Sequence, residues 1–129
     1  MSGDLVGDDP LITSSTDLDT VGTKSDNSVV VVTTSGETVI DGIVITGGYS
    51  AEGNGAGLSH NSGSLHLTRS VVSGNIAVEG AGCYSEASMF VQDCDFRYNR
   101  ALGQGGGMYH SDMLEINNCI FEDNVAAKG

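Results

Sequence analysis

This chain of 129 residues lacks tryptophan, contains a single proline and carries only five lysines and arginines against 17 acidic residues. Its formal net charge of −12 argues against nucleic acid and anionic membrane surfaces as partners, because both are bound through basic patches. No apolar run approaches the ~18 residues that a membrane-spanning helix needs. The first residues also lack the basic start and apolar stretch of a signal peptide. We therefore expect neither nucleic acid nor a membrane as a partner.

Cysteines are few, and they do not indicate a disulfide framework or a zinc site. The chain has three cysteines, an odd number, and no CxxC pair; they are Cys83, Cys94 and Cys119.

Apolar residues at the helical spacing i, i+3, i+4, i+7 are missing as well, which predicts little or no helix. Glycine, in contrast, makes up 19 of the 129 residues, about twice its usual ~7%. Because proline is not enriched with it, we expect tight turns between short strands.

Three glycine-rich triplets indicate stacked structural repeats. They begin at Gly55, Gly80 and Gly105, so the step from one triplet to the next is constant. Internal periods of this length are typical of solenoids. A second landmark keeps nearly the same step, and its members are VSGN ending at Asn75, FRYN ending at Asn99 and FEDN ending at Asn124. Between the landmarks, apolar and polar residues alternate with the period of two that indicates strands.

Stacking is the arrangement that gives these repeats a core. One repeat carries only about five inward side chains, whereas parallel pairing of equivalent strands, ~4.8 Å apart, merges the inward columns. We predict an all-β, right-handed parallel β-helix of about four coils, with ~25 residues per coil. An antiparallel sandwich would also explain the alternation, but not the fixed register. The predicted single domain, 1–129, comprises an irregular acidic segment at 1–28, a first regular coil at 29–54 and repeat coils at 55–79, 80–104 and 105–129.

Several aligned columns are expected to be structural. The asparagine column should form a turn in which stacked amides bond one another along the axis. Phe96 and Phe121 should stack in the core. Cys94 and Cys119 should be neighbours within disulfide range, but side chains that stack in parallel rarely reach the required torsion, so we favour reduced core thiols. The columns of this interpretation contain Asn75, Asn99, Asn124, Cys94, Cys119, Phe96 and Phe121.

Two lateral ion pairs and one aromatic pair follow from the same register. Arg69 should face Asp93, and Arg97 should face Glu122, each on the adjacent coil. The aromatic pair consists of Tyr84 and Tyr109, which is a candidate sugar-stacking platform or, equally, a packing ladder. His60 and His110 share a column but lie two coils apart, about 9.6 Å by strand spacing, which is too far for one metal ion.

The acidic N-terminal segment contains the candidate calcium ligands. Clustered carboxylates with turn residues can supply the oxygen ligands that calcium takes, although a solvated loop over the first coil explains them too. The EF-hand-like start at position 17 lacks the glutamate expected at its twelfth position. No other cofactor is predicted. The candidate ligands are Asp4, Asp8, Asp9, Asp17 and Asp19.

The repeat motifs resemble those of a known group of proteins. GAGL, GAGC and GGGM, followed by VSGN, FRYN and FEDN, resemble the GGA(I/L/M) and FxxN motifs of right-handed parallel β-helix proteins. These include polymorphic outer-membrane protein repeats and large pectin-lyase-like surface proteins of bacteria. Residues 38–48, TVIDGIVITGG, resemble the LDGFTITGG coil that often precedes such repeats. The resemblance covers 27–129 well and implies an extracellular or cell-surface location.

Function is less constrained than fold. Cleavage of acidic polysaccharides on this fold needs converging carboxylates, yet the register pairs neither Asp93 nor Asp95 with another carboxylate. We therefore expect a non-catalytic, adhesin-like segment of a secreted or surface-exposed bacterial protein. It would bind a polysaccharide or a surface protein, or self-associate through an uncapped C-terminal coil, because the sequence ends at Gly129 where the next triplet would begin. The alternative is a fragment of a polysaccharide lyase or glycoside hydrolase of the pectin-lyase-like fold.

Overall fold

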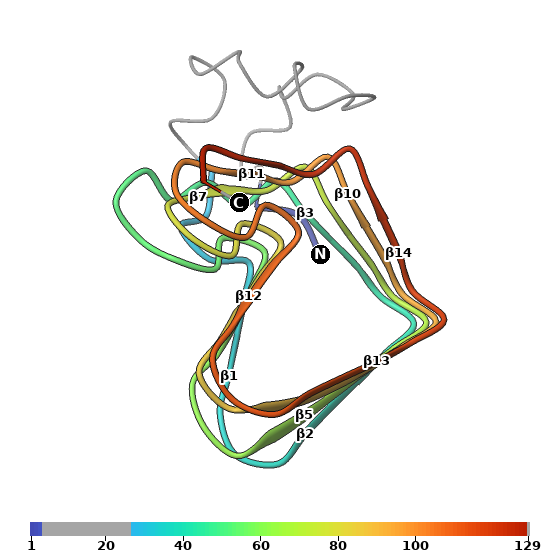
Figure 1. Cartoon of the computed structure of the whole chain (residues 1–129). Helices are drawn as coiled ribbons and strands as arrows, with labels where there is room; N and C mark the ends of the chain where they lie inside the picture. The colour runs from blue at the N-terminus through green and yellow to red at the C-terminus, as the bar shows by residue number, and fades with distance from the viewer. Residues whose placement is uncertain (4–26, 129) are drawn as a thin grey trace.

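The chain forms a parallel β-solenoid of about four turns. The computed structural model describes residues 1–3 and 27–128, and these residues contain strands and turns but no helix. Viewed along the axis, equivalent strands of successive coils superimpose, so that the coils lie one behind another (Figure 1). Every strand pair is parallel. The predicted all-β parallel solenoid is confirmed.

Four sheets run along the axis, three with four strands and one with three. The first contains β1 (Val32–Thr34), β4 (Leu58–His60), β8 (Cys83–Ser85) and β12 (Met108–His110). The second contains β2 (Thr38–Asp41), β5 (Ser64–Thr68), β9 (Ser88–Gln92) and β13 (Leu114–Asn117). The third contains β3 (Val44–Thr46), β6 (Val71–Ser73), β10 (Asp95–Arg97) and β14 (Ile120–Glu122). The fourth contains β7 (Ile76–Ala77), β11 (Arg100–Ala101) and β15 (Val125–Ala126).

The step between coils is constant at the triplets but not at every point of the coil. Leu58 pairs with Cys83, whereas Leu65 pairs with Met89, so the second step is the shorter by a single residue. The difference arises because three residues connect β4 to β5 and only two connect β8 to β9. The extra residue lies in the turn at Gly63, whose φ is 87°. Turn length thus changes between coils while the sheets keep their register.

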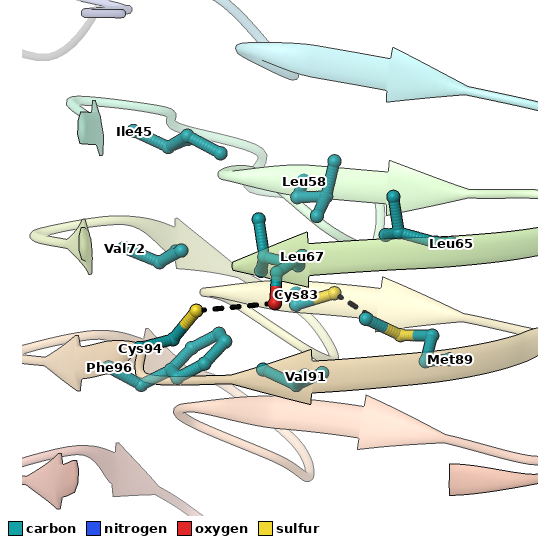
Figure 2. Packing of buried hydrophobic residues seen from close by; sticks show 10 residues of the cluster. All are labelled: Ile45, Leu58, Leu65, Leu67, Val72, Cys83, Met89, Val91, Cys94 and Phe96. Atoms are coloured by element: carbon teal, nitrogen blue, oxygen red, sulfur yellow. Dashed lines mark hydrogen bonds between the residues drawn. The ribbon is translucent and has the colours of Figure 1, made fainter. Parts of the chain in front are cut away.

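The core consists of stacked inward columns. Ile45, Val72 and Phe96 form one fully buried column, and side chains of the other two long sheets meet it in the interior (Figure 2). Burial of each large apolar side chain contributes about 1.5–3 kcal/mol, so stacking supplies what one coil cannot. A second, smaller cluster lies beside the fourth sheet and contains only alanines, which are Ala56, Ala77, Ala81 and Ala101.

The glycine triplets and the asparagine column depend on each other physically. The first glycine of each triplet has a left-handed backbone, with φ of 68°, 56° and 67° at Gly55, Gly80 and Gly105, which glycine adopts without steric cost. The third glycine is needed for close approach. A Cβ at Gly82 would lie 2.3 Å from the Gly107 carbonyl oxygen and 3.0 Å from Asn99 Nδ2. The two landmarks recur together because each asparagine amide packs on a glycine of its own coil.

Asn99 lies at the centre of a hydrogen-bonded amide ladder. Its Oδ1 accepts from the backbone N–H of Asn75 (3.2 Å) and from Asn75 Nδ2 (2.9 Å). Its own Nδ2 donates to the Val72 carbonyl (2.9 Å) and to Asn124 Oδ1 (3.0 Å). Asn75 and Asn99 are both fully buried. The ladder satisfies turn backbone groups that the strands leave unpaired, as buried polar groups require.

The three cysteines are free thiols. The Cys94 Sγ donates to the carbonyls of Gln92 (3.1 Å) and Leu67 (3.5 Å), so it is directed at backbone rather than toward its column neighbour. Cys119 makes the equivalent pair of contacts one coil later. Burial raises the pKa of Cys83 to about 12 and also raises that of Cys94. Both therefore stay protonated and unreactive at neutral pH.

The predicted Arg69–Asp93 ion pair is wrong. The Arg69 guanidinium bonds the Asp41 carboxylate on the preceding coil instead. Asp93 already accepts hydrogen bonds from Asn118 and Gln92. These bonds, chiefly the one from Asn118, hold the pKa of Asp93 below its usual value. Arg69 and Asp93 occupy the same left-handed corner position, so register neighbours need not be bonded partners.

The predicted Arg97–Glu122 pair is present, but it is not the closest contact of this arginine. Nη1 of Arg97 lies 3.8 Å from Glu122, while Nη2 lies 2.7 Å from Asp95 on the same strand. Both pairs are partly exposed, so each contributes at most about 1 kcal/mol.

We predict that Asn99→Ala lowers the free energy of unfolding by about 3 kcal/mol. The substitution removes the acceptor of the buried Asn75 backbone N–H and the side-chain donor that bonds the Val72 carbonyl, and each such lost bond costs ~1–3 kcal/mol. Urea denaturation measures the change. Asn61→Ala is the matched control, because that exposed side chain accepts only from Ser59 Oγ at 3.3 Å, and it should cost less than ~0.5 kcal/mol. Equal losses in the two variants would contradict a structural role for the ladder.

Candidate functional site

The last coil exposes the apolar columns that earlier coils bury. Phe121 is 45% exposed, while Phe96, which stacks against it at 4.8 Å with 3° between ring planes, is fully buried. Ile116 is 41% exposed, while its partner Val91 is 1% exposed. These side chains line a hollow of about 560 Å³ on the C-terminal face, together with Met108, Leu114 and Asn124. The core columns thus continue to the surface at this end of the solenoid.

Backbone edges accompany this apolar face. Strands β12, β13, β14 and β15 each end their sheet, so along the described chain one edge of each has no neighbouring strand. The side chains around the face are mainly acidic, with one lysine, and they are Asp112, Glu115, Glu122, Asp123 and Lys128. The C-terminal face therefore combines an apolar centre, unpaired strand edges and a negative rim.

Tyr84 and Tyr109 stack as the sequence predicts. They are directly paired on β8 and β12, with ring centroids 5.2 Å apart and 7° between ring planes. The Tyr84 hydroxyl donates to Glu86 (2.7 Å), and this bond raises the pKa of Tyr84. Because each ring turns one face to the other, only one outer face per ring is left to meet a sugar. Sugar binding here stays a prediction.

His60 is a buried ionisable group, whereas the sequence-based expectation placed it only in a column with His110. It is fully buried on β4, its Nδ1 lies 2.9 Å from Thr34 Oγ1, and its Nε2 has no hydrogen-bond partner along the described chain. Burial lowers the pKa of His60, against smaller opposing effects of the Gly63 backbone and the Glu37 charge. The alternation Leu58 inward, Ser59 outward could have revealed it. His60 and His110 share their column with Ser85 between them.

The structure brings Asp93 and Asp95 to one shallow hollow of about 270 Å³, although the sequence places them in separate columns. Asp93 has a lowered pKa, so it is ionised at neutral pH and cannot act as a general acid there. Asp95 is paired with Arg97 at 2.7 Å.

The predicted calcium ligands cannot be placed. Asp4, Asp8, Asp9, Asp17 and Asp19 lie outside the described residues. In the part of the chain that is described, no three His, Cys, Asp or Glu side chains come together as a possible metal site. Along the same ranges, no helix is long and apolar enough to cross a membrane.

Comparison with models of protein families, with curated proteins and with solved structures finds no match to this chain. The parallel solenoid thus stands on the structure itself, and the resemblance to pectin-lyase-like and polymorphic outer-membrane proteins stands on the repeat motifs.

We predict that stability falls as the pH drops below about 6.5, the ordinary pKa of histidine. Above that pH His60 is neutral in both the folded and the unfolded chain. Below it the unfolded chain gains a proton that the folded chain binds only at lower pH, so the free energy of unfolding decreases until the folded pKa is reached. Urea denaturation at several pH values between about 6.5 and 5.5 measures the slope.

The control for this slope is a second histidine. His60→Gln should flatten the slope, whereas His66→Gln should leave it unchanged, because His66 is exposed and stacks on Phe90 outside the core. The same slope in both variants would show that His60 is not its source.

Proposed function

We propose that this chain is a non-catalytic interaction module of a secreted or surface-exposed bacterial protein. It docks strand segments of a partner on its C-terminal face, by addition of strands to exposed sheet edges. The observation that carries the proposal is the exposure of Phe121, Ile116 and Leu114, whose equivalents one coil earlier are buried at 0–1% exposure. The adhesin-like role and the surface location rest on the motif resemblance.

Physical chemistry favours such docking. Main-chain hydrogen bonds along an edge give affinity, and the apolar columns supply further free energy as they leave water, at roughly 25 cal/mol per Å². Native proteins usually cover or charge exposed edges. Here the charges of Glu115 and Glu122 point outward from the strands while the inward positions Leu114, Ile116 and Phe121 are apolar. The negative rim disfavours non-specific pairing of strand edges. It leaves the apolar centre available to a partner that carries positive charge around its own contact surface.

A polysaccharide and a protein strand would make different contacts with the C-terminal face. A polysaccharide would meet apolar side chains with few fixed polar groups, whereas a protein strand can satisfy the edge backbone directly. We therefore favour a protein partner, and the Tyr84–Tyr109 stack stays the candidate position for a polysaccharide. Self-association is the simplest case of protein docking, and it gives the proposal a direct test.

We predict weak, concentration-dependent self-association through the last coil at roughly 100 μM protein, a concentration typical of weak encounters. Sedimentation velocity or light scattering measures it. Ile116→Lys should weaken it about tenfold, because a charge enters the apolar centre. Val39→Lys adds the same charge at an outward, 75% exposed position on β2 and should change nothing. A strictly monomeric protein whose last-coil amides exchange as slowly as those of the inner coils would overturn the proposal.

A further inference from the structure

The outer side of the first sheet carries an aromatic stack that begins partway along the solenoid. Tyr84 and Tyr109 are paired on β8 and β12, with ring centroids 5.2 Å apart and 7° between ring planes. One coil earlier the same column holds Ser59, and the coil before that holds Thr33. A serine side chain is too short to cover a tyrosine ring. The ring face that Tyr84 turns toward Ser59 therefore has no second ring against it.

Glycines border the same stack. A Cβ at Gly55 would lie 2.8 Å from the Tyr84 Cβ, and a Cβ at Gly80 would lie 2.9 Å from it. Gly105 has the same relation to Tyr109, again at 2.9 Å. These three positions thus present backbone rather than side chains to the tyrosine rings.

The segments that carry and flank the stack are acidic and contain no basic residue. Residues 49–62, 78–88 and 102–111 include three glutamates but neither lysine nor arginine. Glu52 and Glu86 are exposed, and Glu79 is half-buried. Because complementary charge steers and orients a partner, a ligand of this flank gains from positive charge.

Hydrogen-bond donors beside Tyr84 already have acceptors. The Tyr84 hydroxyl donates to Glu86 at 2.7 Å, and Asn54 Nδ2 donates to Glu79 at 3.5 Å. An ionised carboxylate has about four lone-pair sites, so both glutamates can accept further hydrogen bonds. The surface therefore suits a ligand that donates several hydrogen bonds and needs no donor in return.

From the open ring face, the bordering glycines and the acidic side chains, we propose that this flank binds an arginine side chain of a partner protein. The planar guanidinium lies on the Tyr84 ring above Ser59, where a third ring of the stack would be, and donates to Glu86. Arginine fits better than lysine because its guanidinium is flat, weakly hydrated and stacks on aromatic faces. Ser59 and Tyr84 belong to inner coils, so this inference does not depend on the C-terminal face.

A short capped peptide, Ac-Gly-Arg-Gly-NH2, is the probe, and the full chain is the receptor. NMR shifts of the Tyr84 ring signals follow the titration. We expect a Kd of roughly 10 mM, as suits one exposed cation–π contact with one exposed ion pair. The same peptide with citrulline keeps the shape without the charge and should bind about fivefold more weakly. Maltotriose, an uncharged oligosaccharide, should leave the Tyr84 signals unchanged.

Variants of the protein locate the contact. Ser59→Phe places a ring on the open face of Tyr84 and should abolish binding of the arginine peptide. Ser64→Phe is the matched control, because it adds the same ring at an outward position of β5 and should leave binding unchanged. Glu86→Gln keeps the size of the side chain and should weaken binding about fivefold. Urea denaturation establishes that each variant is folded.

Three results would overturn the inference. Equal binding of the arginine and citrulline peptides would remove the role of charge. Tighter binding of maltotriose than of the arginine peptide would make the flank a sugar-binding surface. Unchanged peptide binding by a folded Ser59→Phe variant would place the contact elsewhere on this acidic chain. None of these results bears on docking at the C-terminal face, which is measured without peptide.

Discussion

The buried amide ladder of Asn75, Asn99 and Asn124 is the interaction on which the rest of this structure depends. It holds successive coils in one register at a turn between strands, and the side chains of Asn75 and Asn99 each bond the coils on both sides of their own. The third glycine of each triplet must lack a Cβ because the amide lies against it. Once ladder and glycines are fixed, the adjoining strands can only stack in parallel, and the apolar columns follow from that stacking.

Much of this arrangement could be predicted because the same side-chain packing recurs in every coil of a solenoid. Aligning the triplets is enough to place Phe96 beside Phe121 and Tyr84 beside Tyr109, since columns in parallel sheets follow sequence period. Bonding partners are predicted less well where a side chain has more than one neighbour within reach. Arg69 had a register partner in Asp93, but amide donors had already occupied that carboxylate, and Asp41 was within reach to accept.

The burial of His60 shows a different limit. Its inward position follows from alternation, but a histidine in an outward-facing turn and one in a core look alike in a single sequence. The three-residue turn that follows β4 and the Thr34 hydroxyl together accommodate the ring, and both are properties of one coil rather than of the repeat. Asp93 and Asp95 likewise share a hollow only because the corner between two sheets brings separate columns together. Local departures from the repeat are the part that a period cannot predict.

Along the described residues, each strand pairs only with the equivalent strands of the coils before and after it. Among the described residues, the Asn124 coil has hydrogen-bonded neighbours on one side, whereas the Asn99 coil has them on both. Protection against unfolding should thus form a gradient that declines toward the exposed coil, as in a linear array of coupled units rather than a single all-or-none globule. A partner that covers the last coil would then do more than occupy a surface: by closing the array it would lengthen the cooperative unit and slow the opening of coils that it never touches.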